Sequence, residues 1–189
     1  MSFKPYEWQS ESVWKFFRDN LDTAIFIAPR QNGKSQILVL ITMVELLLNK
    51  KKILFTSHEV ASCEDFFRKI TFEFESNPIF NNEVSKIIRQ RGAQEIVLTN
   101  GACIQFRART KSAGIGGSNE VLIFDEFQFV TDAMMSAMLP TISAMGNPKV
   151  IYAGTCPRLI DDDVFLKEWL TSLKASQIYL NGVLAIVIH

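Results

Sequence analysis

Short apolar runs alternate with longer segments of helical periodicity along most of this sequence. The short runs predict buried strands, because they have the length of a strand and are bounded by polar or turn residues. These runs occupy residues 24–28, 53–56, 121–124 and 149–153. The segments of helical periodicity occupy residues 6–18, 34–48, 60–74, 131–145 and 163–173. Strands separated by helices indicate an α/β fold with a mostly parallel central sheet, helices on both faces and ligands at the carboxyl ends of the strands.

Two apolar segments depart from this alternation. Residues 96–106 predict a β-hairpin with Asn100-Gly101 at its turn. Residues 175–189 form an apolar tail that does not resemble a soluble surface helix. The tail could be a strand that joins the sheet, or it could mark a truncated or frame-shifted gene or an excised fragment. We therefore expect one domain over residues 1–174, followed by this tail.

The composition is typical of a globular domain. Of the 189 residues, 48% are hydrophobic and 21% are charged, which excludes global disorder. The formal net charge is zero, so any binding of nucleic acid has to come from local patches of charge. The three cysteines are widely spaced and match no zinc-binding pattern, which favours reduced thiols. No membrane span is predicted, because the apolar run at residues 37–48 is too short and contains Glu45.

A candidate phosphate-binding loop follows the first predicted strand. Residues 28–35 have the sequence Ala-Pro-Arg-Gln-Asn-Gly-Lys-Ser, with Ala28 where the usual pattern has glycine. A turn from strand to helix directs backbone N–H groups and the positive end of the helix at one point, where phosphate oxygens bind. Lys34 would reach the β- and γ-phosphates, and the Ser35 hydroxyl would bind Mg²⁺. The candidate nucleotide contacts of the loop are Pro29, Gln31, Asn32, Gly33, Lys34 and Ser35.

Two carboxylates follow the buried run at residues 121–124. Asp125 would hold the metal ion, and Glu126 would orient and deprotonate the attacking water. The alternative is a chance Gly-Lys-Ser sequence at a helix start. Because both motifs follow predicted strands, an ATP site is the better explanation.

A third motif, Gly154-Thr155, follows the run at residues 149–153. The Thr155 hydroxyl could contact the γ-phosphate or its water and report hydrolysis to the rest of the chain. The alternative is an ordinary turn at the end of a strand. The sensor role is favoured only because the phosphate-binding loop and the two carboxylates are also present.

These motifs together resemble the ATPase domain of the terminase large subunits of tailed phages, the motors that pump DNA into capsids. The resemblance covers residues 5–160 and rests on the stretch Ile53-Leu-Phe-Thr-Ser-His58, with the helix after it that carries Phe66 and Phe67, and on four further segments. They are Arg30-Gln-Asn-Gly-Lys-Ser35, Gly114-Ile-Gly-Gly-Ser118 ahead of Asp125-Glu126, Ala153-Gly154-Thr155, and Tyr6-Glu-Trp-Gln9. The resemblance implies a P-loop NTPase of the ASCE/RecA-like class, with ATP and Mg²⁺ as cofactors and Mg-dependent ATP hydrolysis as its reaction.

The resemblance also implies roles for individual residues. Gln9 would hydrogen-bond the adenine edge with Tyr6 or Trp8 packed nearby, although a capping or packing role of Gln9 and Tyr6 at the first helix is an alternative. Arg30 would act as an arginine finger in cis, since a guanidinium stays charged and offers several fixed donors; a surface salt bridge is the alternative. Thr155 would couple hydrolysis to movement, with Glu126 as the general base.

Six basic residues form a candidate DNA-binding patch. They are Lys86, Arg89, Arg91, Arg107, Arg109 and Lys111. Such a patch could grip phosphates without reading sequence, since only Glu95 opposes it within that stretch. Alternatively, Arg107 or Arg109 reaches the ATP of a neighbouring subunit, or the residues are merely a solvated face of the hairpin.

The family implies an ATP-driven motor for double-stranded DNA. Its partners would be the DNA, a portal protein, a terminase small subunit and a homo-oligomeric ring, with no membrane, in the host cytoplasm at the procapsid portal. Terminase large subunits usually carry a nuclease domain, which needs more residues than follow here, so we expect no DNA cleavage. Two alternatives remain: a helicase-like ATPase, disfavoured because 189 residues leave no room for a second motor domain, and a truncated non-catalytic nucleotide-binding remnant.

Overall fold

The computed structural model describes residues 2–29, 31–109, 118–143, 147–155, 177–180 and 183–187. Its helices are α1 (Glu7–Arg18), α2 (Lys34–Leu47), α3 (Val60–Ser76), α4 (Pro78–Asn81), the 3₁₀ turn η1 (Phe127–Phe129), α5 (Asp132–Met138) and α6 (Pro140–Ser143). Its strands are β1 (Thr23–Ile27), β2 (Lys52–Ser57), β3 (Val84–Ile88), β4 (Glu95–Leu98), β5 (Cys103–Ala108), β6 (Val121–Asp125), β7 (Lys149–Gly154), β8 (Gln177–Leu180) and β9 (Val183–Val187).

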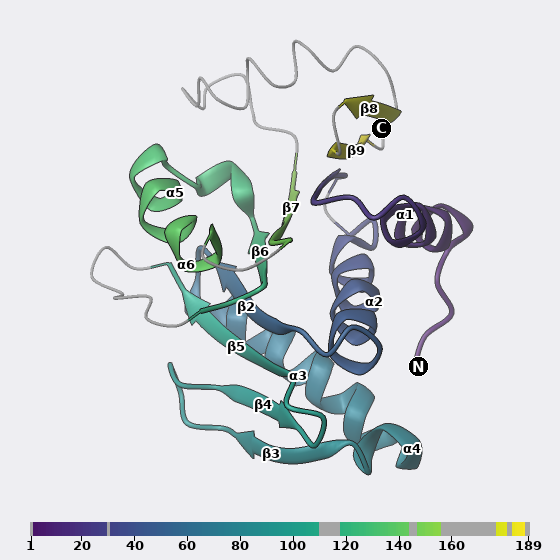
Figure 1. The fold of residues 1–189 in the computed structure, drawn as a ribbon, viewed down its shortest axis with the longest axis vertical. Helices are drawn as coiled ribbons and strands as arrows, with labels where there is room; N and C mark the ends of the chain where they lie inside the picture. The colour runs from purple at the N-terminus through teal and green to yellow at the C-terminus, as the bar shows by residue number, and fades with distance from the viewer. Residues whose placement is uncertain are drawn as a thin grey trace.

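The strands form one sheet in the order β3-β4-β5-β2-β6-β7-β1-β9-β8 (Figure 1). The neighbours from β5 through β9 pair in parallel, and β3, β4 and β8 pair antiparallel at the two edges. The mostly parallel sheet is therefore confirmed, and so is the hairpin of β4 and β5 with Gly101 at positive φ in its turn. The tail does contribute strands, because β9 pairs with β1.

Alternate residues of the buried strands supply two apolar layers, one on each face. In β1, Ala24 and Phe26 pack in the cluster that α1, α2 and α3 cover, whereas Ile25 and Ile27 pack in the cluster that η1, α5 and α6 cover. Figure 1 shows α1 and α2 on the side of the sheet opposite α5 and α6. Helices on both faces are thus confirmed, as expected where crossover helices cover a parallel sheet.

Two predicted helices differ from the structure or fall outside it, and two elements of the structure were not predicted. The helix predicted over residues 131–145 is divided into α5 and α6 at Leu139, which keeps helical angles (φ −56°, ψ −37°), because Pro140 has no N–H to continue the helical hydrogen bonds. The edge strand β3 and the short helix α4 were not predicted. The helix predicted at residues 163–173 lies outside the described residues. Among the residues that the structure describes, every helix is too short or too polar to cross a lipid bilayer.

Candidate nucleotide-binding site

The loop between β1 and α2 depends on a glycine at its end. Gly33 caps α2 with φ of 80°, a left-handed conformation that favours glycine. A Cβ atom at Gly33 would also lie 2.2 Å from Nε2 of Gln9. Gln31 has φ of 65°, so the loop turns through two left-handed residues before the helix begins. This turn presents the N-terminus of α2 to the carboxyl edge of the sheet.

Lys34 and Ser35 occupy the first turn of α2. Nζ of Lys34 donates hydrogen bonds to the carbonyl oxygens of Ala28, at 2.6 Å, and Pro29, at 2.8 Å. The ammonium group therefore lies against the loop backbone in this conformation. Asn32 is exposed, and Arg30 lies outside the described residues.

The two carboxylates lie at the end of β6, as predicted, and Glu126 has an unusual backbone. Its φ and ψ of 52° and 48° are left-handed, which is rare for a residue with a side chain. Its Oε2 accepts a hydrogen bond from Oγ of Ser57 at 2.9 Å and one from Oγ of Ser62 at 3.4 Å. Ser57 is the last residue of β2 and Ser62 lies in the first turn of α3; neither was predicted as part of the site. They orient the Glu126 carboxylate from the neighbouring strand and helix.

Asp125 is largely buried, and its environment opposes ionisation. Burial raises the pKa of its carboxyl group to about 6, and the negative charge of Glu126 adds to this. The backbone N–H of Glu126, which donates to Oδ1 of Asp125 at 3.0 Å, acts in the opposite direction, as do the charges of Arg109 and Lys34. Because the surrounding positive charge does not offset the cost of ionising this buried carboxyl group, a bound cation would stabilise its ionised form. Mg²⁺ is a suitable cation, since it prefers oxygen ligands.

A cavity of about 520 Å³ brings the predicted residues together. Its lining includes Gln31, Lys34, Ser35, Asp125, Glu126, Gly154 and Thr155. The backbone N–H of Thr155 donates to Oε1 of Gln128 at 3.3 Å, which links the end of β7 to the turn after Glu126. The phosphate-binding loop, the carboxylates and the third motif thus share one cavity, although they are far apart in sequence.

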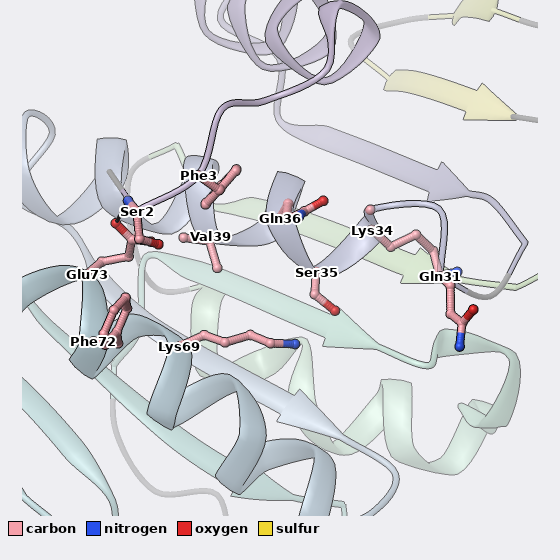
Figure 2. Close-up of a pocket in the computed structure, with 11 residues that line it drawn as sticks. Ser2, Phe3, Gln31, Lys34, Ser35, Gln36, Val39, Lys69, Phe72 and Glu73 are labelled. Atoms are coloured by element: carbon pink, nitrogen blue, oxygen red, sulfur yellow. Dashed lines mark hydrogen bonds between the residues drawn. The ribbon is translucent and has the colours of Figure 1, made fainter. Parts of the chain in front are cut away.

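A second cavity, of about 400 Å³, lies beside the first between the N-terminal segment, α2 and α3 (Figure 2). Gln31, Lys34, Ser35 and Lys69 line both cavities, so the two are adjacent. Figure 2 shows Lys69 extended from α3 toward Ser35. The remaining wall is formed by Ser2, Phe3, Gly33, Gln36, Val39, Phe72 and Glu73. Three apolar side chains, Phe3, Val39 and Phe72, thus face the cavity beside polar and charged groups, a mixture that suits a polar small molecule with an apolar part.

The side chain of Gln9 is fully buried and engaged within the protein. Its Oε1 accepts from the backbone N–H of Tyr6 at 2.8 Å, and its Nε2 donates to the carbonyl of Gly33 at 2.9 Å. The first bond belongs to a capping box at the start of α1. Gln9 therefore holds α1 against the phosphate-binding loop, while Tyr6 is 63% exposed. Contact of either residue with adenine stays a prediction.

The six basic residues do not form one exposed patch. The prediction that Arg109 contacts DNA from the surface is wrong, because only 4% of this residue is exposed. Burial also lowers the pKa of its guanidinium to about 10. Arg89 pairs with Glu75 at 2.6 Å, and Arg91 pairs with Glu64 at 2.7 Å. Both glutamates belong to α3, outside residues 86–111, so the charges within that stretch alone do not reveal these ion pairs. Arg107 donates to backbone carbonyls, Lys86 is exposed, and Lys111 lies outside the described residues.

Comparisons with known proteins agree on one family. The sequence profile described as "Terminase large subunit, ATPase domain" matches residues 6–156. The large terminase of bacteriophage HK97 has a similar fold, with a TM-score of 0.81 and 17% identity over 98% of this chain and 39% of that protein. The large terminase ATPase domain of Thermus phage P74-26 has a TM-score of 0.75 and 15% identity over 98% of this chain and 81% of that domain. The Phi-28 gp11 DNA packaging motor has a TM-score of 0.56 and 9% identity over 93% of this chain and 58% of that protein.

The chain spans less than half of the HK97 large terminase, which it resembles over nearly its own full length. None of the curated proteins compared with the sequence matches it. The family profile nevertheless covers most of the chain, from the first helix to the residue after Thr155. The chain therefore belongs to the terminase large subunits and corresponds to their ATPase domain.

Proposed function

We propose that this chain binds Mg·ATP, hydrolyses it and thereby drives double-stranded DNA into a capsid as the motor domain of a terminase large subunit. The observation that carries the proposal is the shared cavity, where Lys34 and Ser35 from α2 meet Asp125 and Glu126 from β6. A phosphate-binding helix N-terminus opposite two carboxylates suits a nucleoside triphosphate with its metal ion.

Each residue has a role that its position supports. Lys34 exchanges its bonds to the loop carbonyls for the β- and γ-phosphate oxygens. Ser35 and Asp125 supply the oxygen ligands that Mg²⁺ needs, and the ion neutralises charge on the phosphates. Glu126, oriented by Ser57, accepts the proton of the attacking water. Thr155 reports the loss of the γ-phosphate through the end of β7.

The two cavities support one orientation of the nucleotide, which forms part of this proposal. The carboxylates and Thr155 line only the larger cavity, so the reacting γ-phosphate belongs there. The base and ribose then occupy the second cavity, between Phe3 and Phe72. Aromatic side chains of this kind can pack against a base. Gln9 and Tyr6 support this end indirectly, by holding α1 to the loop.

DNA, a portal protein, a small subunit and a homo-oligomeric ring are the proposed partners, in the host cytoplasm at the procapsid portal. The DNA contact rests on family membership more than on the basic residues, since Arg89 and Arg91 are already paired with glutamates. Lys86 is the exposed basic side chain of that stretch to which the described residues give no ion pair.

The test is ATP hydrolysis by the purified chain, with and without double-stranded DNA, beside Glu126→Gln and Lys34→Ala. Turnover that DNA stimulates and that both variants lose would support the motor. Unwinding of a duplex would instead favour a helicase-like ATPase. Binding of Mg·ATP without turnover, with or without DNA, would leave a nucleotide-binding remnant and contradict hydrolysis by this chain.

A further inference from the structure

Arg109 is a buried cation directly behind the two carboxylates. It follows β5, and 4% of its surface is exposed. Its Nη1 donates to the carbonyl oxygen of Thr56 at 2.9 Å and to the Thr56 hydroxyl at 3.1 Å. Its Nη2 donates to the carbonyl oxygens of Asp125, at 2.7 Å, and Glu126, at 3.2 Å. The guanidinium thus bridges the carboxyl ends of β2 and β6.

The four acceptors are backbone or hydroxyl oxygens, and no carboxylate is among them. The Thr56 hydroxyl also donates to the carbonyl of Ile123 at 3.1 Å, so the guanidinium belongs to a network across β2 and β6. Its Nε is buried and makes no hydrogen bond with any described residue. A buried cation with an unsatisfied N–H is a costly way to join two strands that already pair along their length. A role beyond joining the strands is therefore indicated.

That role is suggested by the backbone of Glu126. Its left-handed conformation is unfavourable and persists only where surrounding contacts fix it. Nη2 of Arg109 binds the carbonyls at both peptide groups that bracket the turn, those of Asp125 and Glu126. The carboxylate of the same residue is held separately, by hydrogen bonds from Ser57 and from Ser62, which lines the cavity. Backbone and side chain of Glu126 are thus held from two directions.

We propose that Arg109 is a positioning residue for ATP hydrolysis, which fixes the turn at Asp125-Glu126 so that the Glu126 carboxylate faces the attacking water. The inference rests on the proposed hydrolysis at this site. Arg109 acts through Glu126 and does not contact the nucleotide cavity, whose lining does not include it. Its loss should therefore slow the hydrolytic step and leave nucleotide binding nearly intact.

The test compares Arg109→Lys with the wild type and with Arg18→Lys, an arginine on α1 paired with Asp19 outside the site. Lysine retains the charge but cannot span four acceptors with a planar fork. We expect kcat to fall at least tenfold in Arg109→Lys. We expect KM, and the Kd of a fluorescent ATP analogue, to stay within about threefold. Arg18→Lys should match the wild type.

Thermal unfolding monitored by circular dichroism shows whether each variant is folded. A folded Arg109→Lys with wild-type kcat, or with kcat and nucleotide affinity lost in parallel, would overturn the inference. If Arg109→Lys does not fold, Thr56→Val is judged by the same criteria, because it removes one acceptor and leaves the guanidinium in place. Absence of turnover in the wild type would refute the proposed function, and the inference with it. Turnover with the same kcat in the wild type and the variant would refute the inference alone.

Discussion

Replacing Asp125 by asparagine should make the nucleotide-free protein more stable at neutral and alkaline pH. Burial raises the pKa of Asp125 in the folded protein to about 6, from a usual value of 3.8. The folded state therefore binds this proton more tightly than the unfolded state, and the ionised carboxylate opposes folding. The difference of about two pKa units corresponds to about 3 kcal/mol of unfolding free energy above pH 6. An asparagine side chain does not ionise, so the Asp125→Asn variant avoids this penalty.

The pH dependence distinguishes this cause from a local change in packing. The penalty is complete above the folded pKa, falls as pH decreases through 6, and disappears below 3.8. The gain in Asp125→Asn should thus be about 3 kcal/mol at pH 8 and about half of that near pH 5. Urea unfolding followed by circular dichroism, at both pH values and without nucleotide or Mg²⁺, measures both gains.

Asp65→Asn is a control of opposite sign. A hydrogen bond and ion pair with Lys69 lower the pKa of the Asp65 carboxyl group, so its ionised form favours folding above its usual pKa. Asp65→Asn should lose stability at pH 8, and the loss should vanish as pH falls through that lowered pKa. An Asp125→Asn variant that is less stable than the wild type at pH 8, or whose gain is equal at pH 8 and pH 5, would refute the reasoning.

Three further predictions concern the loop and the base. Glu126→Gln should retain ATP binding and lose turnover by about a hundredfold, and unchanged turnover in a steady-state assay would remove Glu126 as the general base. Gly33→Ala should lower the free energy of unfolding by at least about 1 kcal/mol, because its new Cβ combines positive φ with a 2.2 Å approach to Gln9. Gly101→Ala has a similar φ but nothing within 4 Å, so a loss as large as that of Gly33→Ala in urea unfolding would argue against the steric part. Arg30→Ala should lower kcat more than it raises KM; a raised KM alone would make Arg30 a ground-state binding residue.

The central strands were predictable because they are buried on both faces. Residues 121–124 and 150–153 are apolar runs, and the strands predicted over 121–124 and 149–153 extend by one residue at the carboxyl end. The edge strand β3 escaped prediction because it has Ser85 and Lys86 exposed in its middle and lacks a clear apolar face. The division of the helix at Leu139 was predictable from the sequence, since Pro140 has no N–H to donate to the carbonyl four residues before it.

The site was predictable where its chemistry is local in sequence. Lys34, Ser35, Asp125 and Glu126 belong to short motifs, and the structure brings them into one cavity. Ser57 and Ser62 were not predictable, since they contact Glu126 from 69 and 64 residues away and carry no motif of their own.

Arg109 illustrates the limit of reading charge along the chain. Clustered basic residues in sequence are usually exposed, which is why the sequence alone places Arg109 in a DNA-binding patch. Its burial follows from the pairing of β5 with β2, which places the end of β5 beside Thr56. That placement depends on the order of strands in the sheet, which cannot be predicted from the spacing of charged residues in the sequence.

The pairing of β9 with β1 has a consequence for solubility. β1 leads into the phosphate-binding loop, with β7 on one side and β9 on the other. Removal of β8 and β9 would turn this apolar strand into a sheet edge with a row of open N–H and C=O groups, which is a template for pairing with another chain. A version of the protein ended at residue 174 is therefore expected to form aggregates through β1. Strand β9 thus protects β1 from pairing with another molecule.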